Sequence, residues 1–272
     1  MNKLGKVGQK AVRVLIFYLG LIGVWYLLWY FLVEKYGVVS SNIFVEPEVV
    51  ARSLYGFLIK NDNNFWRQMA KTLERLVIGY GVSVAVGVVL AGLIFSLRGF
   101  GGELRALLAG LQSLPNMCWV PFAIIICGLD ANAVYFVIVI GSAPAIALSV
   151  ESSLRNISPT YIRVGKTLGC NRVGMLTRIY LPASLPAMVA GLKHAWAFAW
   201  RALMAGEMNC LFAVNASGLG YLMFNLRYSG ALDKVICIML VLVAVGVLFD
   251  KAVFGTVENA ILTKHGIRRN DQ

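Results

Sequence analysis

The chain has 272 residues, of which 59% are hydrophobic and only 14% are charged, and its formal net charge at pH 7 is +12. With a mean hydropathy of +0.74, it falls outside the range of ordinary soluble domains. The composition therefore excludes a water-soluble globular protein and predicts one that lives in lipid.

Six apolar stretches are long enough to cross a bilayer as helices. The hydrocarbon core is about 30 Å thick, so a helical crossing needs roughly 20 mostly apolar residues. Helices are expected because backbone groups cannot stay unpaired in lipid, and the stretches lack the alternation of membrane barrel strands. We predict a single all-α polytopic membrane domain over residues 1–272, with spans at about 12–33, 72–97, 104–127, 131–151, 184–206 and 233–257.

Further structural features are predicted in the second span, in the third span and in the segment between the first and second spans. Between the first and second spans, Pro47 begins a predicted amphipathic helix, and 61–64 forms a turn rich in asparagine. In the second span, small residues every four positions predict close approach by another helix; they are Gly79, Ser83, Gly87 and Ala91. In the third span, Pro115 and Pro121 predict a break into two half-helices.

The basic residues indicate the orientation, because lysine and arginine collect in short cytoplasmic loops. Six spans place both termini on one side, and a cytoplasmic N-terminus puts most of the basic residues inside, including the group at 155–178. We therefore expect both termini in the cytoplasm. Nucleic-acid binding is a poor explanation of the positive charge, because the charges flank apolar spans rather than cover a compact soluble domain.

A polar, basic segment at about 152–183 separates the fourth and fifth spans. Ser158 and Pro159 predict a helix start, Gly169 a sharp stop, and Asn171 or Arg172 a second short start. We expect a helix-turn-helix knob that presents Tyr161, Met175, Leu176 and basic side chains to a soluble partner, before Leu181 and Pro182 redirect the chain. The alternative is an ordinary basic loop that only sets the topology.

The fifth span carries polar and aromatic residues on one face. These are Lys193, Trp196, Ala197, Trp200, Met204 and Glu207, with Arg201 at the edge. Charges at such depth usually face a water-filled path or a partner, so we predict a translocation pathway along this face. The competing interpretation is structural, with Arg201 paired to Glu207 or Glu74 and Arg75 paired to another acidic neighbour.

The knob resembles the cytoplasmic coupling loop of permease subunits in binding-protein-dependent ABC importers with the type I fold. The resemblance rests on a glycine, Gly169, followed after nine residues by Ile179, Leu181 and Pro182. It extends from about residue 43 to the C-terminus and is closest to the nitrate, sulfonate and taurine branch, through the strings at 72–79, 114–121, 181–186, 205–208 and 218–222. The family signature begins Glu-Ala-Ala, whereas this chain has Arg163, Val164 and Gly165.

The resemblance implies a membrane subunit of an importer in the bacterial inner membrane. Its implied partners are cytoplasmic ABC ATPase subunits that bind ATP and Mg²⁺, a second permease copy in a homodimer, and an extracytoplasmic solute-binding protein. The implied substrate is a small anionic or polar solute. The implied coupling residues are Tyr161, Arg163, Gly165, Lys166, Gly169, Arg172, Met175, Leu176, Ile179, Leu181 and Pro182.

Two other function classes are less well supported. Gly165-Lys166-Thr167 is not a P-loop, because Thr160 stands where its first glycine belongs. Catalytic motifs are absent from the sequence, and the five cysteines are scattered without metal-site spacing, so we expect neither an enzyme nor a metal site. A gradient-driven secondary transporter or channel remains the alternative, although the halves show no convincing inverted repeat.

Overall fold

The structure is a computed structural model that describes residues 3–38, 40, 43–97, 99–210 and 216–264. All regular structure in these ranges is helical. Within the described residues, five helices are long and apolar enough to cross a membrane, and a bent helix pair makes a sixth crossing if it is counted as one span. The α-helices are α1 (Lys3–Trp29), α2 (Pro47–Ile59), α3 (Phe65–Ser96), α4 (Gly101–Ser113), α5 (Val120–Cys127), α6 (Ala131–Arg155), α7 (Pro159–Thr167), α8 (Arg172–Met175), α9 (Leu181–Cys210), α10 (Leu219–Tyr228), α11 (Leu232–Phe249) and α12 (Gly255–Lys264).

The chain divides into two compact units. The first comprises Met1–Trp66 and Met223–Val241, and the second comprises Arg67–Leu222 and Leu242–Gln272. The helix predicted after Pro47 is confirmed as α2, in the first unit. It buries Val50 and Phe57, and Phe57 stacks on Phe65 with ring centroids 5.3 Å apart.

The predicted turn at 61–64 is also present in the first unit. Asn61, Asn63 and Asn64 adopt positive φ angles of 55°, 57° and 52°. Asparagine tolerates this left-handed conformation because its short polar side chain can form local hydrogen bonds. The Asn61 side chain accepts a hydrogen bond from the backbone N–H of Trp66 at 3.1 Å, which ties the turn to the start of α3.

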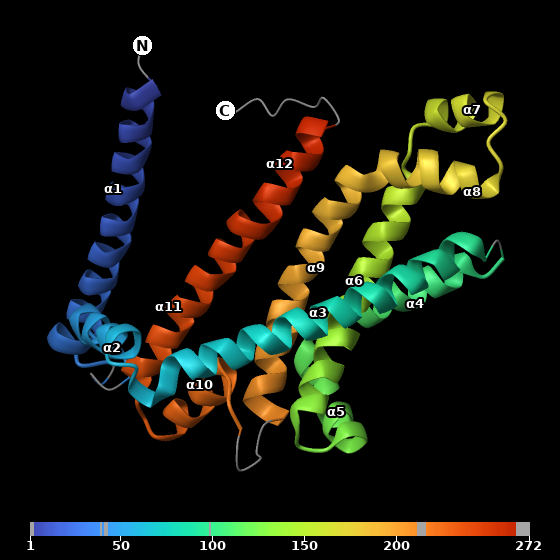
Figure 1. Cartoon of the computed structure of the whole chain (residues 1–272). Helices are drawn as coiled ribbons and strands as arrows, with labels where there is room; N and C mark the ends of the chain where they lie inside the picture. The colour runs from blue at the N-terminus through green and yellow to red at the C-terminus, as the bar shows by residue number, and fades with distance from the viewer. Residues whose placement is uncertain (1–2, 39, 41–42, 98, 211–215, 265–272) are drawn as a thin grey trace. The chain divides into compact units, whose positions relative to one another are not determined.

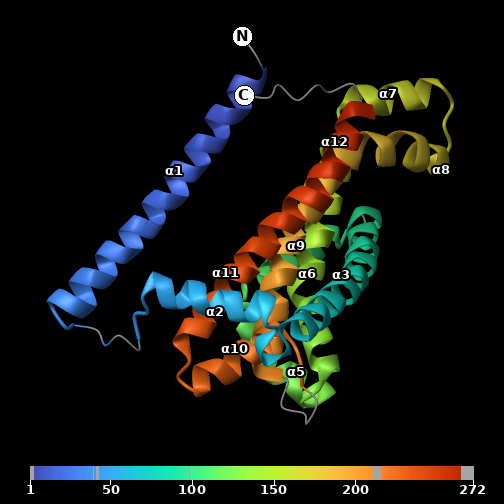
Figure 2. The same cartoon turned by 60° about the vertical axis from the view of Figure 1, so that its left-hand side comes forward.

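Helices α6 and α9 lie side by side and form the centre of the second unit (Figures 1 and 2). Small residues allow this contact. A Cβ atom on Gly191 would lie 2.5 Å from the Ser149 side chain, and one on Gly206 would lie 3.1 Å from Val134. Helix α6 is accordingly the most buried of the five long apolar helices, because 67% of its apolar 18-residue stretch is buried inside the protein.

The small-residue face predicted for the second span packs against α6. A Cβ atom on Gly79 would lie 2.8 Å from Ile138, and one on Gly87 would lie 2.6 Å from Ile146. Ser83 and Ala91, from the same repeat, are fully buried. Close approach between apolar helices is the expected use of such residues, because lipid provides little hydrophobic drive for helix association.

The predicted break of the third span into two half-helices is confirmed. Helix α4 ends at Ser113, a 3₁₀ turn covers Asn116–Trp119, and the two halves are bent by 99°. Pro115 lies at the break, whereas Pro121 falls in the first turn of α5. A proline there removes an N–H that has no helical partner in any case, so Pro121 fits the start of the second half-helix.

Candidate functional site

The segment between α6 and α9 forms the predicted knob of two short helices, α7 and α8 (Figure 1). Ser158 caps α7 through its side chain, and Pro159 occupies the first turn. The Asn171 side chain caps α8 by accepting a hydrogen bond from the backbone N–H of Gly174 at 2.7 Å. Both caps satisfy backbone donors that a short helix would otherwise leave unpaired.

Gly169 makes the turn between the two short helices. Its φ of +72° lies in the left-handed region. The backbone N–H of Gly169 donates to Lys166 O and that of Cys170 donates to Gly165 O, each at 3.0 Å. This pair of bonds is the Schellman arrangement, in which glycine after the last helical residue satisfies the terminal carbonyls.

The inner face of the knob is built on Gly165. This glycine is buried, and a Cβ atom on it would lie 2.5 Å from Met175 Sδ and 3.1 Å from Ile179 Cγ1. Met175 therefore packs α8 against α7. Met175 is only half-buried, so its contact with a soluble partner stays a prediction.

The outer face of the knob combines exposed apolar and basic side chains. Tyr161 and Leu176 are exposed as predicted. Three further exposed apolar residues were not singled out from the sequence, and they are Val164, Leu168 and Val173. Arg163, Lys166 and Arg172 are exposed as well.

The exit from the knob at Leu181 and Pro182 stays within helical structure. A π-helical segment, Leu176–Tyr180, joins α8 to α9 without leaving the helical conformation. Figure 1 shows that α8 runs crosswise to α9. Pro182 is the second residue of α9 and lies within this continuous helical stretch.

A buried glutamate lies at the base of the knob. Glu151, near the end of α6, is fully buried and pairs with Arg105 of α4 at 3.4 Å and with Arg155 of its own helix. Its charge thereby links the first half of the broken span to the helix that leads into the knob.

The predicted pathway face of α9 divides into two parts. Lys193, Trp196, Trp200 and Arg201 line a cavity of about 590 Å³, together with Ala197, Gly246, Val247 and Asp250. The Nζ atom of Lys193 lies 2.9 Å from Asp250 Oδ1. Trp196 stacks on Phe249 with ring centroids 4.9 Å apart.

Met204 and Glu207 do not line this cavity. Met204 is half-buried against the core of α3, α5, α6 and α9. Glu207 is fully buried and forms an ion pair with Arg75 Nη1 at 2.8 Å. The pathway prediction is wrong for these two residues, because neighbouring helices cover the far end of the α9 face.

Glu207 is the centre of a polar cluster in the second unit. Its carboxylate accepts hydrogen bonds from Thr72 Oγ1 at 2.9 Å and from the backbone N–H of Gly220 at 3.0 Å. Thr72 Oγ1 in turn accepts from the backbone N–H of Leu219 at 2.7 Å. Gly218 and Gly220 are required here, because Cβ atoms on them would lie 2.5 and 2.7 Å from Glu207 atoms.

Residues of this cluster come from three of the sequence segments on which the family resemblance rests. Thr72 and Arg75 belong to 72–79, Glu207 to 205–208, and the glycines to 218–222. The structural alternative for Arg75, pairing with an acidic neighbour, is thus confirmed. The proposed pairing of Arg201 with Glu207 or Glu74 is wrong, because Glu207 binds Arg75 and Glu74 binds Lys71.

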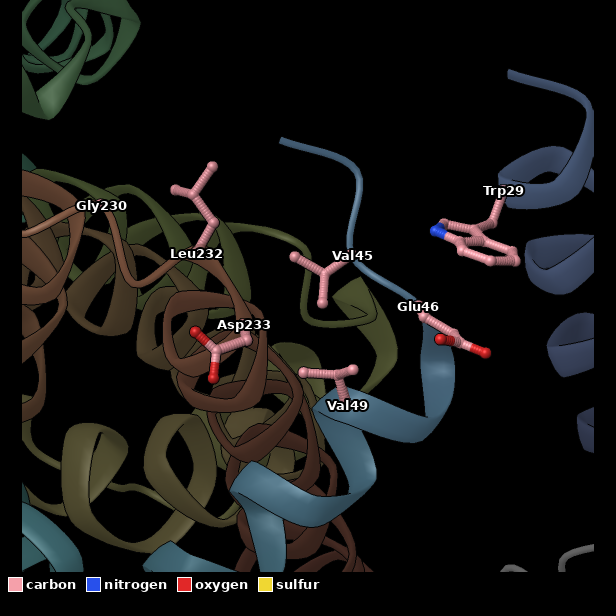
Figure 3. A pocket seen from close by; sticks show the side chains of 7 residues that line it. All are labelled: Trp29, Val45, Glu46, Val49, Gly230, Leu232 and Asp233. Atoms are coloured by element: carbon pink, nitrogen blue, oxygen red, sulfur yellow. The ribbon is translucent and has the colours of Figure 1, made fainter. Parts of the chain in front are cut away.

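Two further cavities bear on the candidate sites. One, of about 380 Å³, lies at the break between α4 and α5 and is lined by residues 112–117, Phe198, Arg201 and Ala205. The other, of about 300 Å³, lies in the first unit and is lined by Trp29, Val45, Glu46, Val49, Gly230, Leu232 and Asp233 (Figure 3). Its charged residues, Glu46 and Asp233, are both acidic, so it does not suit an anion.

Comparison with known proteins gives concordant results. The family of binding-protein-dependent transport system inner membrane components matches residues 83–255. The nitrate import permease protein NrtB of Leptolyngbya laminosa is 25% identical over 92% of this chain and 87% of its own length. The putative aliphatic sulfonates transport permease protein SsuC of Escherichia coli is 26% identical, over 85% and 84% of the two chains.

The fold is also found in a solved transporter. An inward-facing structure of the MetNI methionine ABC transporter matches with a TM-score of 0.61, 21% identity, and coverage of 72% of this chain and 94% of the other. The family match, over more than half of the chain, agrees with the helical bundle and the knob between α6 and α9. The chain belongs to the binding-protein-dependent transport system inner membrane components and is a permease subunit of an ABC importer.

Proposed function

We propose that this permease imports a small oxyanion, such as nitrate or a taurine-like sulfonate, across a bacterial inner membrane with energy from a separate ATPase. Two similar permeases carry the names of nitrate and aliphatic sulfonate transport. The cavities along α9 contain Lys193 and Arg201, and basic side chains favour anionic solutes. The relatives' names and the charge of the cavities both support this substrate class.

The knob is the proposed contact with the ATPase, and the geometry of α7 and α8 carries this proposal. Its inner face is packed through Gly165 and Met175, while its outer face exposes apolar side chains such as Tyr161 and Leu168, 59% and 73% exposed. A rigid helical pair with an uncovered apolar surface suits a protein partner. Movement of that partner would pass through Glu151 and α9 into the bundle.

The other components follow from the same proposal. ATP and Mg²⁺ would be bound by the ATPase, and this chain would contribute no nucleotide site. A second copy of the permease would complete the membrane part as a homodimer. A solute-binding protein would deliver the oxyanion on the outer side, with both termini of this chain in the cytoplasm. Lys193, Trp196, Trp200 and Arg201 would line the route.

The test is reconstitution of the permease in proteoliposomes with its ATPase and its solute-binding protein. Uptake of ¹⁵N-nitrate, methanesulfonate and taurine is measured with each component omitted in turn. We expect uptake of at least one solute only when ATP, ATPase and binding protein are all present. Uptake by the permease alone, driven by an ion gradient, would contradict the proposal and favour a secondary transporter or channel.

A further inference from the structure

The two basic residues on the α9 face have different electrostatic surroundings. Lys193 is neutralised by Asp250, whose Oδ1 atom lies 2.9 Å from Lys193 Nζ. Arg201 has no carboxylate partner among the described residues. Its Nε donates to Ala197 O at 3.0 Å, and its guanidinium carbon lies 4.6 Å from the centroid of the Phe198 ring. The remaining guanidinium donors are available to a ligand.

The surroundings of Arg201 favour a negative ligand. Arg201 lies on the boundary of both α9 cavities, and the cavity at the α4/α5 break adds the polar side chains of Gln112, Ser113 and Asn116. None of the residues that line this cavity is acidic. An unneutralised cation within a membrane span is costly unless water or an anion faces it. The cavity therefore combines one fixed positive charge with amide donors and has no competing carboxylate.

We propose that the cavity at the α4/α5 break is a binding subsite for a monovalent oxyanion, with Arg201 as its charged contact and Gln112 and Asn116 as hydrogen-bond donors. The planar guanidinium can donate two parallel hydrogen bonds to two oxygens of one anion, which an ammonium cannot match. This subsite rests on the proposed function, because the bound oxyanion would be the transported solute.

The bend supplies the cavity with its polar lining. Pro115 lies where α4 has ended and the chain bends by 99°, and residues 112–117 at this bend line the cavity. Irregular backbone at membrane depth is tolerated where protein covers it or where it lines a polar cavity. The break thus has a role in the subsite beyond completing the crossing.

The experiment uses a reporter cysteine inside the cavity of the detergent-solubilised full-length permease. Ser113→Cys is labelled with N-ethylmaleimide, and fragment-ion mass spectrometry separates this label from that on native Cys118. Sodium nitrate, sodium methanesulfonate and sodium chloride are titrated as probes. We expect nitrate or methanesulfonate to slow labelling at position 113 more strongly than chloride.

The Arg201 variants then test the contact. Arg201→Gln should weaken this protection at least about tenfold, the usual loss when a charge-assisted hydrogen bond is removed. Arg201→Lys should give an intermediate result. The matched control is Arg52→Gln, which removes an exposed arginine of α2 and should leave protection unchanged. Each variant is checked for unchanged elution on gel filtration.

Several outcomes would overturn the subsite. One is equal protection of position 113 from labelling by all three salts. Another is anion protection that survives Arg201→Gln but is lost in Lys193→Gln. A third is protection of position 113 by added phosphatidylglycerol but by neither oxyanion. The last result would assign the guanidinium to a lipid headgroup. Anion protection does not need ATPase or binding protein, so failure of the subsite is distinguishable from failure of ATP-driven import.

Discussion

Gly169 allows the knob to turn without strain, because its φ of +72° is a conformation that other residues reach only at a cost. Left-handed backbone costs an ordinary residue about 1–2 kcal/mol, whereas asparagine is better tolerated. A Cβ atom at this position would meet no described atom within 4 Å, so the turn conformation is the only constraint found there.

This separates two substitutions at the same position. Gly169→Val should distort the turn and lower ATP-driven uptake several-fold, and Gly169→Asn should keep most of the activity. Uptake in proteoliposomes and co-purification of the ATPase are the measurements. Equal activity of the two variants would show that the turn geometry does not matter for coupling.

Glu207 and Arg75 form a pair whose loss should be costly. Glu207 is fully buried, and the Arg75 side chain is 9% exposed. Removing one partner leaves an uncompensated buried charge, which typically costs about 3–5 kcal/mol. Glu207→Gln should therefore lower the midpoint of thermal unfolding in detergent clearly.

The comparison for this pair is Lys71→Gln. Lys71 pairs with Glu74 at 2.8 Å, but both side chains are about half exposed, at 45% and 51%. Exposed ion pairs contribute about 1 kcal/mol or less. If the thermal unfolding midpoint of Glu207→Gln is no lower than that of Lys71→Gln, the buried cluster has no stabilising role.

Helix α3 shows at the level of elements how small residues determine packing in this bundle. Gly87 faces Ile146 and the carbonyl of Ala143 on α6. Gly92 lies on the same helix, but a Cβ atom added to it would have no described atom within 4 Å. The two glycines look alike in sequence. They differ in which side of α3 they occupy.

Substitutions at these glycines should therefore differ in stability. Gly87→Leu should separate α3 from α6, and overpacking of this kind costs about 1–3 kcal/mol. Gly92→Leu should be close to neutral. Thermal unfolding of both variants in the same detergent checks this, and the packing assignment is wrong if Gly92→Leu is the less stable of the two.

At the scale of the whole molecule, the topology assigned from charge can be tested directly. Along the described part of the chain between the knob and Ser229, α9 is the helix that is long and apolar enough to cross a membrane. In a variant with native cysteines replaced by alanine, Arg172→Cys should react with an impermeant maleimide only in inside-out vesicles. Ser229→Cys should react only in spheroplasts. Reaction of both positions from the same side would rule out the crossing by α9.

Much of the architecture could be predicted from the pattern of residues. Apolar length identifies the spans, Ser158 and Asn171 identify helix starts, and Gly169 identifies the turn, because caps and turns are local chemistry. The packing of Met175 against Gly165 and the place of Pro121 in the first turn of α5 could not be predicted, for the opposite reason. Their roles depend on a facing residue and on where a helix begins, which periodicity does not specify.

The sequence by itself determined that this protein spans a membrane, roughly where its apolar crossings lie and that a basic knob separates two of them. Those properties follow from lipid exposure, backbone hydrogen bonding and local turn chemistry, which act on neighbouring residues. Only the tertiary structure decided which charges are neutralised: Glu207 by Arg75, Lys193 by Asp250, and Arg201 by no described carboxylate. Ion pairing depends on contacts between residues up to 132 positions apart, and no helical period in the sequence encodes them.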